Sequence, residues 1–225
     1  MGILTAILDL LFPPKCIFCQ KLLRAGTKVC CEDCAKALSQ SGGARSGMFF
    51  RTCCVPLTYE GQVRDAIIRF KFKDHPGYAT EFGRIMAGSI RSQLQGQYDL
   101  ITWIPVSAQR LKQRGYDQAM LLAMATALEL GDVAVETLKK SMDTPAQSSL
   151  GGPEARKSNV LGAYCVPDPV LVEGKRILLI DDVVTTGATL EEASRMLLEA
   201  GAKEVVAAAL AQPPDTTNNT CEVSS

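Results

Sequence analysis

The chain has 225 residues, and its 24 basic and 24 acidic side chains leave no formal net charge. This length accommodates one α/β domain with a small appendage. The neutral balance argues against a globally basic nucleic-acid-binding protein, although a local basic patch is compatible with it. Aromatic residues make up only 6% of the chain, so the composition indicates no stacking platform for single strands.

Residues 2–12 are apolar, with aliphatic side chains at helical spacing up to Pro13 and Pro14. The stretch lacks the basic flank and the small-residue cleavage site of a secretory signal. It is also too short to span a bilayer. We therefore expect a docking helix, no membrane span and a cytoplasmic protein.

Two Cys-x-x-Cys pairs come next. Cys16 and Cys19 form the first pair, and eleven residues separate it from Cys31 and Cys34. Each turn directs two sulfurs at one point, and two such turns complete a tetrahedral Zn²⁺ site. A site closed by four sulfurs is structural. Cys30 could substitute for Cys31, and buried free thiols or a redox pair are the alternative to a metal.

Three regions emerge along the chain. Residues 1–50 hold the helix and the four-cysteine zinc-binding module, and they end in a small, polar run from Ser39 to Gly47 that we interpret as a linker. Residues 51–213 alternate strand-like and helix-like segments, which predicts an α/β fold with a parallel sheet flanked by helices. Residues 214–225 are polar and predicted to be disordered.

Several segments of the middle region have clear periodicity. Residues 98–106 predict a strand that runs into a proline turn. Helical periodicity covers residues 63–72, 78–94 and 117–130.

A strand, a helix and a second strand follow. Residues 176–180 and 204–210 are apolar runs typical of strands buried on both faces. Between them, residues 190–200 have one apolar helical face. Thr189 and Glu192 have capping-box spacing at its start, and Gly201 suits the C′ position at its end. This order implies a parallel, right-handed crossover.

The first of these strands delivers Asp181 and Asp182 to its carboxyl end, where ligands of open α/β sheets bind. Backbone N–H groups and threonine hydroxyls of the following loop would form an anion pocket of phosphate size at the start of the helix. The two aspartates could accept hydrogen bonds from vicinal ribose hydroxyls and hold Mg²⁺ directly or through water. The loop comprises Val183, Val184, Thr185, Thr186, Gly187, Ala188 and Thr189.

An acidic strand end followed by a polar turn is also common without any function. Adjacent carboxylates repel each other, however, and cost stability unless a cation or hydroxyls compensate, which favours a site. The sequence contains no Walker-type phosphate loop and no GxGxxG after a strand, so nucleotide sites of those kinds are not supported.

Residues 176–190 closely resemble the 5-phosphoribosyl pyrophosphate (PRPP) signature of type I phosphoribosyltransferases. The resemblance implies that Asp181 and Asp182 face the ribose hydroxyls and that Val183 to Thr189 hold the 5-phosphate. It also implies a Mg²⁺-complexed PRPP as the ligand.

Residues 103–119 place three basic side chains just past a strand end and a proline turn. Taken alone, they favour a solvated basic helix face. The stretch nevertheless resembles the hallmark of the ComF family, a "PVP" turn followed by "RxxRGfnQa", with Asp117 where Asn is usual. Phosphoribosyltransferases hold pyrophosphate at this turn. The resemblance therefore implies four contacts: Val106, Ser107, Arg110 and Arg114.

Two further stretches resemble the same family. Residues 144–164 are similar to its mobile loop over the active site, the alternative being a plain surface loop. Residues 59–72 match its entry to the domain. Lys71 is a candidate phosphate contact there, but a snorkelling surface lysine is the more frequent case. His75 has no evident partner and no assigned role.

A zinc module joined to a phosphoribosyltransferase domain is the ComF architecture. Where many relatives carry a second set of cysteine pairs, this chain has only Cys53 and Cys54, so we expect one zinc. The resemblance implies a cytoplasmic role in natural competence, with single-stranded DNA and a translocase-like helicase as partners. Three functions fit: an active phosphoribosyltransferase, a ribose-phosphate or nucleic-acid binding module, and an adaptor that docks a partner protein. The sequence reveals neither an acceptor pocket nor a general base.

Overall fold

A computed structural model describes residues 13–23, 30–38, 43–72, 75–141 and 161–214. Its centre is a sheet with the strand order β1-β2-β8-β7-β4, in which β3 also pairs with β8. All of these pairings are parallel except that of β1 with β2. The strands are β1 (Gly43–Arg45), β2 (Cys53–Val55), β3 (Leu57–Thr58), β4 (Leu100–Trp103), β7 (Arg176–Val183) and β8 (Glu204–Gln212).

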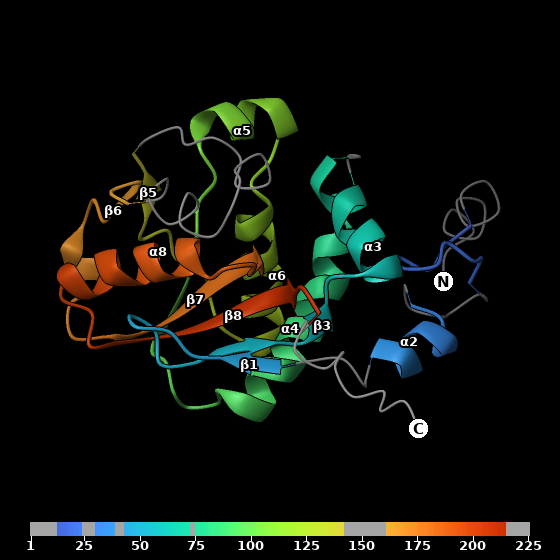
Figure 1. Ribbon diagram of the computed structural model, residues 1–225, viewed down its shortest axis with the longest axis horizontal. Coiled ribbons are helices and arrows are strands. Elements are labelled where there is room, and N and C mark those ends of the chain that lie inside the picture. The colour runs from blue at the N-terminus through green and yellow to red at the C-terminus, as the bar shows by residue number, and fades with distance from the viewer. Residues whose placement is uncertain (1–12, 24–29, 39–42, 73–74, 142–160, 215–225) are drawn as a thin grey trace, which may run out of the picture.

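Helices cover both faces of this sheet, and Figure 1 shows α8 (Ala188–Glu199) on one face with α4 and α6 on the other. Side chains of β7 alternate between the two faces. Leu178 and Ile180 belong to the apolar cluster of α3 (Gly61–Phe72), α4 (Tyr78–Gln93) and α6 (Gln118–Leu130), whereas Ile177 and Leu179 belong to the cluster of α8. The doubly buried strands and the parallel crossover predicted from the sequence are confirmed.

The remaining elements are short. Helix α5 (Ala108–Arg114) follows β4, and β5 (Lys139–Lys140) pairs antiparallel with β6 (Tyr164–Cys165). A 3-10 helix, η2 (Pro169–Leu171), precedes β7. No helix in the described ranges has the length and apolar character needed to cross a bilayer.

The ends of β7 and α8 differ from the prediction. β7 continues to Val183, because its pairing with β8 extends to Val183 opposite Ala211. α8 begins at Ala188, with Gly187 at the N-cap in the left-handed region (φ 81°) and no side-chain cap. The predicted capping box is therefore wrong.

Glu192, expected to complete the capping box, has other partners. The Glu192 carboxylate accepts a hydrogen bond from Gly162 N at 2.6 Å and pairs with Arg195. The predicted end of α8 is confirmed, because Gly201 (φ 99°) and Ala202 donate to the carbonyls of the last turn in a Schellman motif.

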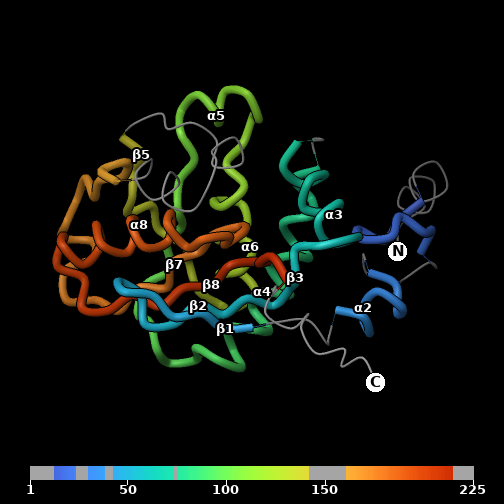
Figure 2. Tube along the Cα trace, in the orientation of Figure 1, coloured from blue at the N-terminus to red at the C-terminus, as the bar shows by residue number. Residues whose placement is uncertain are grey.

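The four-cysteine module, residues 15–23 and 30–38 with α2 (Glu32–Leu38), lies beside α3 in Figures 1 and 2. Arg69 Nη2 of α3 donates to the carbonyls of Ile17 at 2.7 Å and Phe18 at 2.9 Å. Gln20 Nε2 donates to Tyr78 Oη of α4 at 3.2 Å. The module is thus fixed to the helices of one sheet face.

The predicted linker is wrong in its second half, because Gly43–Arg45 form β1 at the sheet edge. A three-residue strand has no periodicity that could reveal it. Four sequence predictions lie outside the described residues: the helix at residues 2–12, linker residues 39–42, most of the loop over the site (144–160) and the tail from 215. The domain limits at residues 50 and 213 stay predictions.

Candidate functional site

The carboxyl ends of β4 and β7 form one edge of the sheet. Ile104 N donates to Ile180 O at 3.0 Å, which extends the β4–β7 pairing by one residue before the chain turns at Pro105. β7 then leads into the threonine-rich loop beside that turn. Because both turns leave parallel neighbouring strands at their carboxyl ends, they border the position at which open α/β sheets bind ligands.

Asp181 and Asp182 occupy this edge with different partners. Asp181 Oδ1 accepts a hydrogen bond from Asp182 N at 2.8 Å. Asp182 Oδ2 lies 2.8 Å from Lys71 Nζ, and both side chains are largely buried. The interpretation of Lys71 as a snorkelling surface lysine is therefore wrong. The sequence named Lys71 as a candidate phosphate contact but gave no sign of this ion pair, because only the packing of α3 on the sheet brings Lys71 and Asp182 together.

The environment of Asp181 disfavours its negative charge. Burial, reinforced by the charge of Asp182, raises the pKa of the Asp181 carboxyl from 3.8 to about 8. The hydrogen bond from Asp182 N and the charge of Lys71 oppose this rise without cancelling it. A divalent cation or a hydroxyl donor would stabilise the ionised form, so this strand end is suited to a Mg²⁺-associated polyol.

The loop after β7 presents unused backbone donors. Val184 N donates to Ala211 O at 3.0 Å, and Ala188 N is 3.4 Å from Thr186 Oγ1. Within the described ranges, the amides of Thr185, Thr186 and Gly187 have no acceptor. They precede the N-terminus of α8, where the helix dipole favours an anion. The loop can therefore bind a phosphate group.

Asp117 fixes the neighbouring turn. Its Oδ2 accepts from Val106 N and its Oδ1 from Met120 N, each at 3.0 Å, so that one carboxylate holds the turn and caps α6. Burial raises the pKa of this carboxyl. Ser107 caps α5 by accepting from Arg110 N. Sequence reasoning noted Asp117 only as a departure from Asn, although an Asp directly before a helical stretch is a recognisable cap.

Most of the basic stretch is exposed, as a solvated helix face would be, but Arg114 at its end is not. Arg114 lies over the ring of Phe72, with its Cζ 4.7 Å from the ring centroid, and Nη1 donates to Gln118 Oε1 at 2.7 Å. Burial lowers the pKa of Arg114, while the charge of Asp182 opposes that change. This guanidinium therefore adds positive charge beside Asp182, on the side of the site next to α3.

The four predicted ligands of the cysteine module lie together. The Sγ atoms of Cys16, Cys19, Cys31 and Cys34 are all within 4.8 Å of one another, and those of Cys19 and Cys31 are 3.6 Å apart. Tetrahedral Zn²⁺ with bonds of about 2.3 Å would separate its sulfurs by about 3.8 Å. The donor set and its spacing fit a structural zinc.

Cys30 is not part of this group. Its Sγ donates to Cys31 O at 3.4 Å, and burial, with the charge of Cys16, raises its pKa to about 12. Cys16 behaves in the opposite way. Burial would raise its pKa, but hydrogen bonds from the backbone, chiefly that of Cys31, lower it to about 6. Geometry thus selects Cys31 over Cys30.

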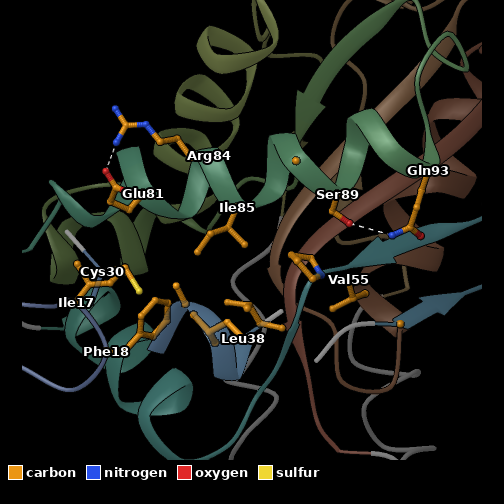
Figure 3. Close-up of a pocket in the computed structure, with 15 residues that line it drawn as sticks. Ile17, Phe18, Cys30, Leu38, Val55, Glu81, Arg84, Ile85, Ser89 and Gln93 are labelled. Atoms are coloured by element: carbon orange, nitrogen blue, oxygen red, sulfur yellow. Dashed lines mark hydrogen bonds and ion pairs between the residues drawn. The ribbon is translucent and has the colours of Figure 1, made fainter. Parts of the chain in front are cut away.

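A separate cavity of about 770 Å³ opens between the cysteine module and α4 (Figure 3). Phe18 and Leu38 of the module face Ile85 of α4 and Val55 of β2 across it. Glu81 and Arg84 form an ion pair at its border. No residue of the Asp181 loop lines this cavity.

The chain is similar to one protein family and to several curated proteins. Residues 117–222 match the phosphoribosyl transferase domain family. Competence protein ComFC of Streptococcus pneumoniae is 26% identical over 83% of this chain and 77% of its own length. Competence protein ComFC of Bacillus subtilis is 29% identical over 76% of this chain and 67% of its own. DNA utilization protein YhgH of Salmonella typhi is 34% identical, over 48% of this chain and 46% of its own length.

Proposed function

The chain belongs to the ComF family, and on that premise we propose that it binds Mg²⁺-complexed PRPP, or a related ribose phosphate, at the carboxyl edge of β4 and β7. One observation carries the proposal: the adjacent Asp181 and Asp182 directly precede a loop whose amides at Thr185, Thr186 and Gly187 have no acceptor in the described part of the chain. A sugar diol with a neighbouring phosphate satisfies both features at once.

The roles of the acidic pair and the loop follow from their chemistry. Asp181 and Asp182 accept hydrogen bonds from the ribose hydroxyls and hold Mg²⁺ directly or through water. Residues 183–189 surround the 5-phosphate with backbone N–H groups and hydroxyls. Gly187, at φ 81°, takes the left-handed conformation that begins α8 without the strain of a side chain.

The pyrophosphate group would lie at the turn before α5. Ser107 caps α5, which carries Arg110 and Arg114, and the Val106 amide becomes available only if its hydrogen bond to Asp117 is replaced. In an active transferase, Mg²⁺ and these cations would stabilise the charge of the departing pyrophosphate. The acceptor is not specified by any of these residues.

The biological setting is proposed from the relatives. Two of them are named competence proteins and one a DNA utilization protein. We place this chain in DNA uptake in the cytoplasm, with single-stranded DNA and a competence helicase as partners. Zn²⁺ bound by Cys16, Cys19, Cys31 and Cys34 would stabilise the module.

An adaptor is the second candidate, and the apolar cavity between the module and α4 favours it. Such a protein would use the module to dock a partner protein. The ligand site would then act as a sensor or be silent. This function differs from the first in depending on the zinc module rather than on Asp181.

Calorimetry with Mg²⁺-PRPP tests the principal proposal. The wild-type protein is expected to bind, and Asp181→Asn and Asp182→Asn to bind at least about tenfold more weakly, because each removes a charge-assisted contact. Asp65→Asn, an exposed carboxylate on α3, is the matched control and should bind normally. No binding by the wild type would overturn the proposal.

Three further measurements separate the functions. PRPP turnover with a nucleobase or amine that is lost in Asp181→Asn supports the enzyme. Salt-sensitive binding of single-stranded DNA that survives this substitution supports a nucleic-acid binding module. Loss of a protein partner in Cys16→Ser, with PRPP binding intact, supports the adaptor.

A further inference from the structure

Residues 45–50, which we call the strap, run from the last residue of β1 toward β2 and contact the start of α8. At one end, Arg45 Nη1 donates to Thr185 O at 2.6 Å, so a charged side chain from the sheet edge holds a carbonyl of the phosphate loop. Hydrogen bonds from charged groups are stronger than those between neutral ones. Arg45 therefore holds residues 183–189, the phosphate loop, tightly at Thr185.

The strap is also held by the first turn of α8. Glu191 Oε1 accepts from Met48 N and Glu191 Oε2 from Phe49 N, both at 2.9 Å. A Cβ atom on Gly47 would lie 2.5 Å from Glu191 Oε1 and 2.3 Å from Phe50 Cε1, so any larger residue would force these side chains to shift. The strap is thus fixed to the helix whose N-terminus forms the phosphate pocket.

The end of the strap is anchored in the apolar core. Phe50 is 4% exposed and belongs to the same buried cluster as Val184, within the phosphate loop, and Leu190, directly after it. The strap and the loop thus share a buried cluster in addition to the polar contacts of Arg45 and Glu191. A loop held from two sides loses fewer conformations when a ligand binds.

The Arg45 contact orients the backbone amide that follows Thr185, because of the geometry of the peptide bond. Thr185 C=O and Thr186 N–H belong to one planar trans unit, in which they point in opposite directions. By holding the Thr185 oxygen, Arg45 fixes the direction of the Thr186 N–H. That amide is one of the donors for which the described residues provide no acceptor.

We propose that Arg45 and Glu191 are positioning residues that hold the phosphate loop in its binding arrangement before a ligand arrives. The effect on PRPP rests on the function proposed above, whereas the effect on the order of the free loop does not. A purely electrostatic role makes the opposite prediction for Glu191. In that case, removing the Glu191 carboxylate from the neighbourhood of an anion site would strengthen PRPP binding. If Glu191 positions the loop, its removal weakens PRPP binding.

Hydrogen exchange of the ligand-free protein tests the positioning directly. In Arg45→Met and Glu191→Ala, the hydrogen-bonded amides at the two ends of the loop should exchange about tenfold faster, as expected when a hydrogen bond to a charged group is lost. These are Val184 N, which donates to Ala211 O, and Ala188 N, which donates to Thr186 Oγ1. Glu191→Gln retains one carbonyl acceptor and should be intermediate. Two control variants should match the wild type: Arg51→Met, directly after the strap, and Glu199→Ala, in the last turn of α8.

Calorimetry with Mg²⁺-PRPP provides the second measurement. Arg45→Met and Glu191→Ala should both bind more weakly than the wild type, and Arg45→Lys should recover part of the loss because an ammonium can donate to the same carbonyl. Unchanged exchange in both Arg45→Met and Glu191→Ala, or tighter binding by Glu191→Ala, would overturn the positioning role. If the wild type does not bind PRPP, the proposed ligand is wrong, and the exchange data alone decide the role of the strap.

Discussion

Lys71 Nζ lies 2.8 Å from Asp182 Oδ2, with 17% and 16% of the two side chains exposed. This ion pair joins the last turn of α3 to the end of β7 and supplies a cation to a strand end that carries two adjacent carboxylates. A sugar hydroxyl or Mg²⁺ that reaches Asp182 must share it with Lys71. The Lys71–Asp182 pair therefore affects both the stability of the ligand-free protein and the binding of a ligand at Asp182.

Replacing Lys71 with methionine should destabilise the protein by about 2 kcal/mol, because it leaves Asp182 largely buried without its cation. Millimolar Mg²⁺ should restore part of this loss by supplying the missing positive charge. Urea unfolding with and without Mg²⁺ measures both effects.

Lys139→Met is the matched control for this measurement. Lys139 pairs with Glu136 at 3.2 Å on an exposed surface, so its replacement should change the unfolding free energy by less than about 0.5 kcal/mol. Equal losses in the two variants would show that the Lys71–Asp182 pair contributes nothing specific.

The stability of the ligand-free protein should depend on the ionisation of Asp181. Because the pKa of this carboxyl is about 8 in the folded chain and near 3.8 otherwise, the folded state retains a proton that the unfolded state releases between these values. The stabilising contribution of Asp181 is therefore complete below about pH 4 and is lost as the pH rises to about 8. Urea unfolding across this interval measures the slope.

Asp181→Asn provides the comparison, since an amide cannot release a proton and the variant should lose this slope. Asp65→Asn, on the exposed side of α3, should retain it. Mg²⁺ competes with the proton, so its affinity for the wild type should increase with pH up to about 8. A wild-type profile that matches Asp181→Asn would show that Asp181 is already ionised at low pH.

Asp117→Asn should lower the free energy of unfolding. It should also strengthen the binding of Mg²⁺-PRPP, because it removes a negative charge from the anion site. The two oxygens of Asp117 each accept one backbone N–H, so the amide group of Asn must oppose one of these donors at a cost of about 1 kcal/mol. Removal of the charge should lower the pKa of Asp181, which Asp117 helps to raise. The steepest part of the stability profile should therefore move to lower pH.

A capping aspartate outside the site provides the control for the loss of a helix cap. Asp168 caps η2 at the surface through Val170 N at 3.2 Å, and Asp168→Asn should leave the pH profile and Mg²⁺-PRPP affinity unchanged. If Asp117→Asn weakens the affinity for the ligand, its role in holding the turn outweighs its charge.

Metal content should distinguish the two adjacent cysteines of the module. Cys31→Ser should lose zinc, because its sulfur belongs to the four-membered group, whereas Cys30→Ser should retain one equivalent. Elemental analysis of the purified variants measures this directly. Full zinc retention by Cys31→Ser together with loss in Cys30→Ser would reverse the assignment.

Local patterns in the sequence determined the elements that carry the chemistry. The apolar runs of β7 and β8, with the amphipathic stretch of α8 between them, specify strands buried on both faces and a crossover helix. The same stretch places Asp181 and Asp182 at a strand end. The spacing of the two cysteine pairs predicts their convergence, which the structure confirms. Each of these inferences depends on residues close together in the chain.

The tertiary structure alone decided which distant residues complete the site. Lys71 meets Asp182 because α3 packs on the sheet beside the end of β7, and Arg45 reaches Thr185 because β1 joins the sheet edge. Neither contact leaves a local signal, since a single lysine in a helix or an arginine in a three-residue strand is compatible with full exposure. Such contacts follow from the order of strands and the packing of helices, which depend on the whole core rather than on local periodicity.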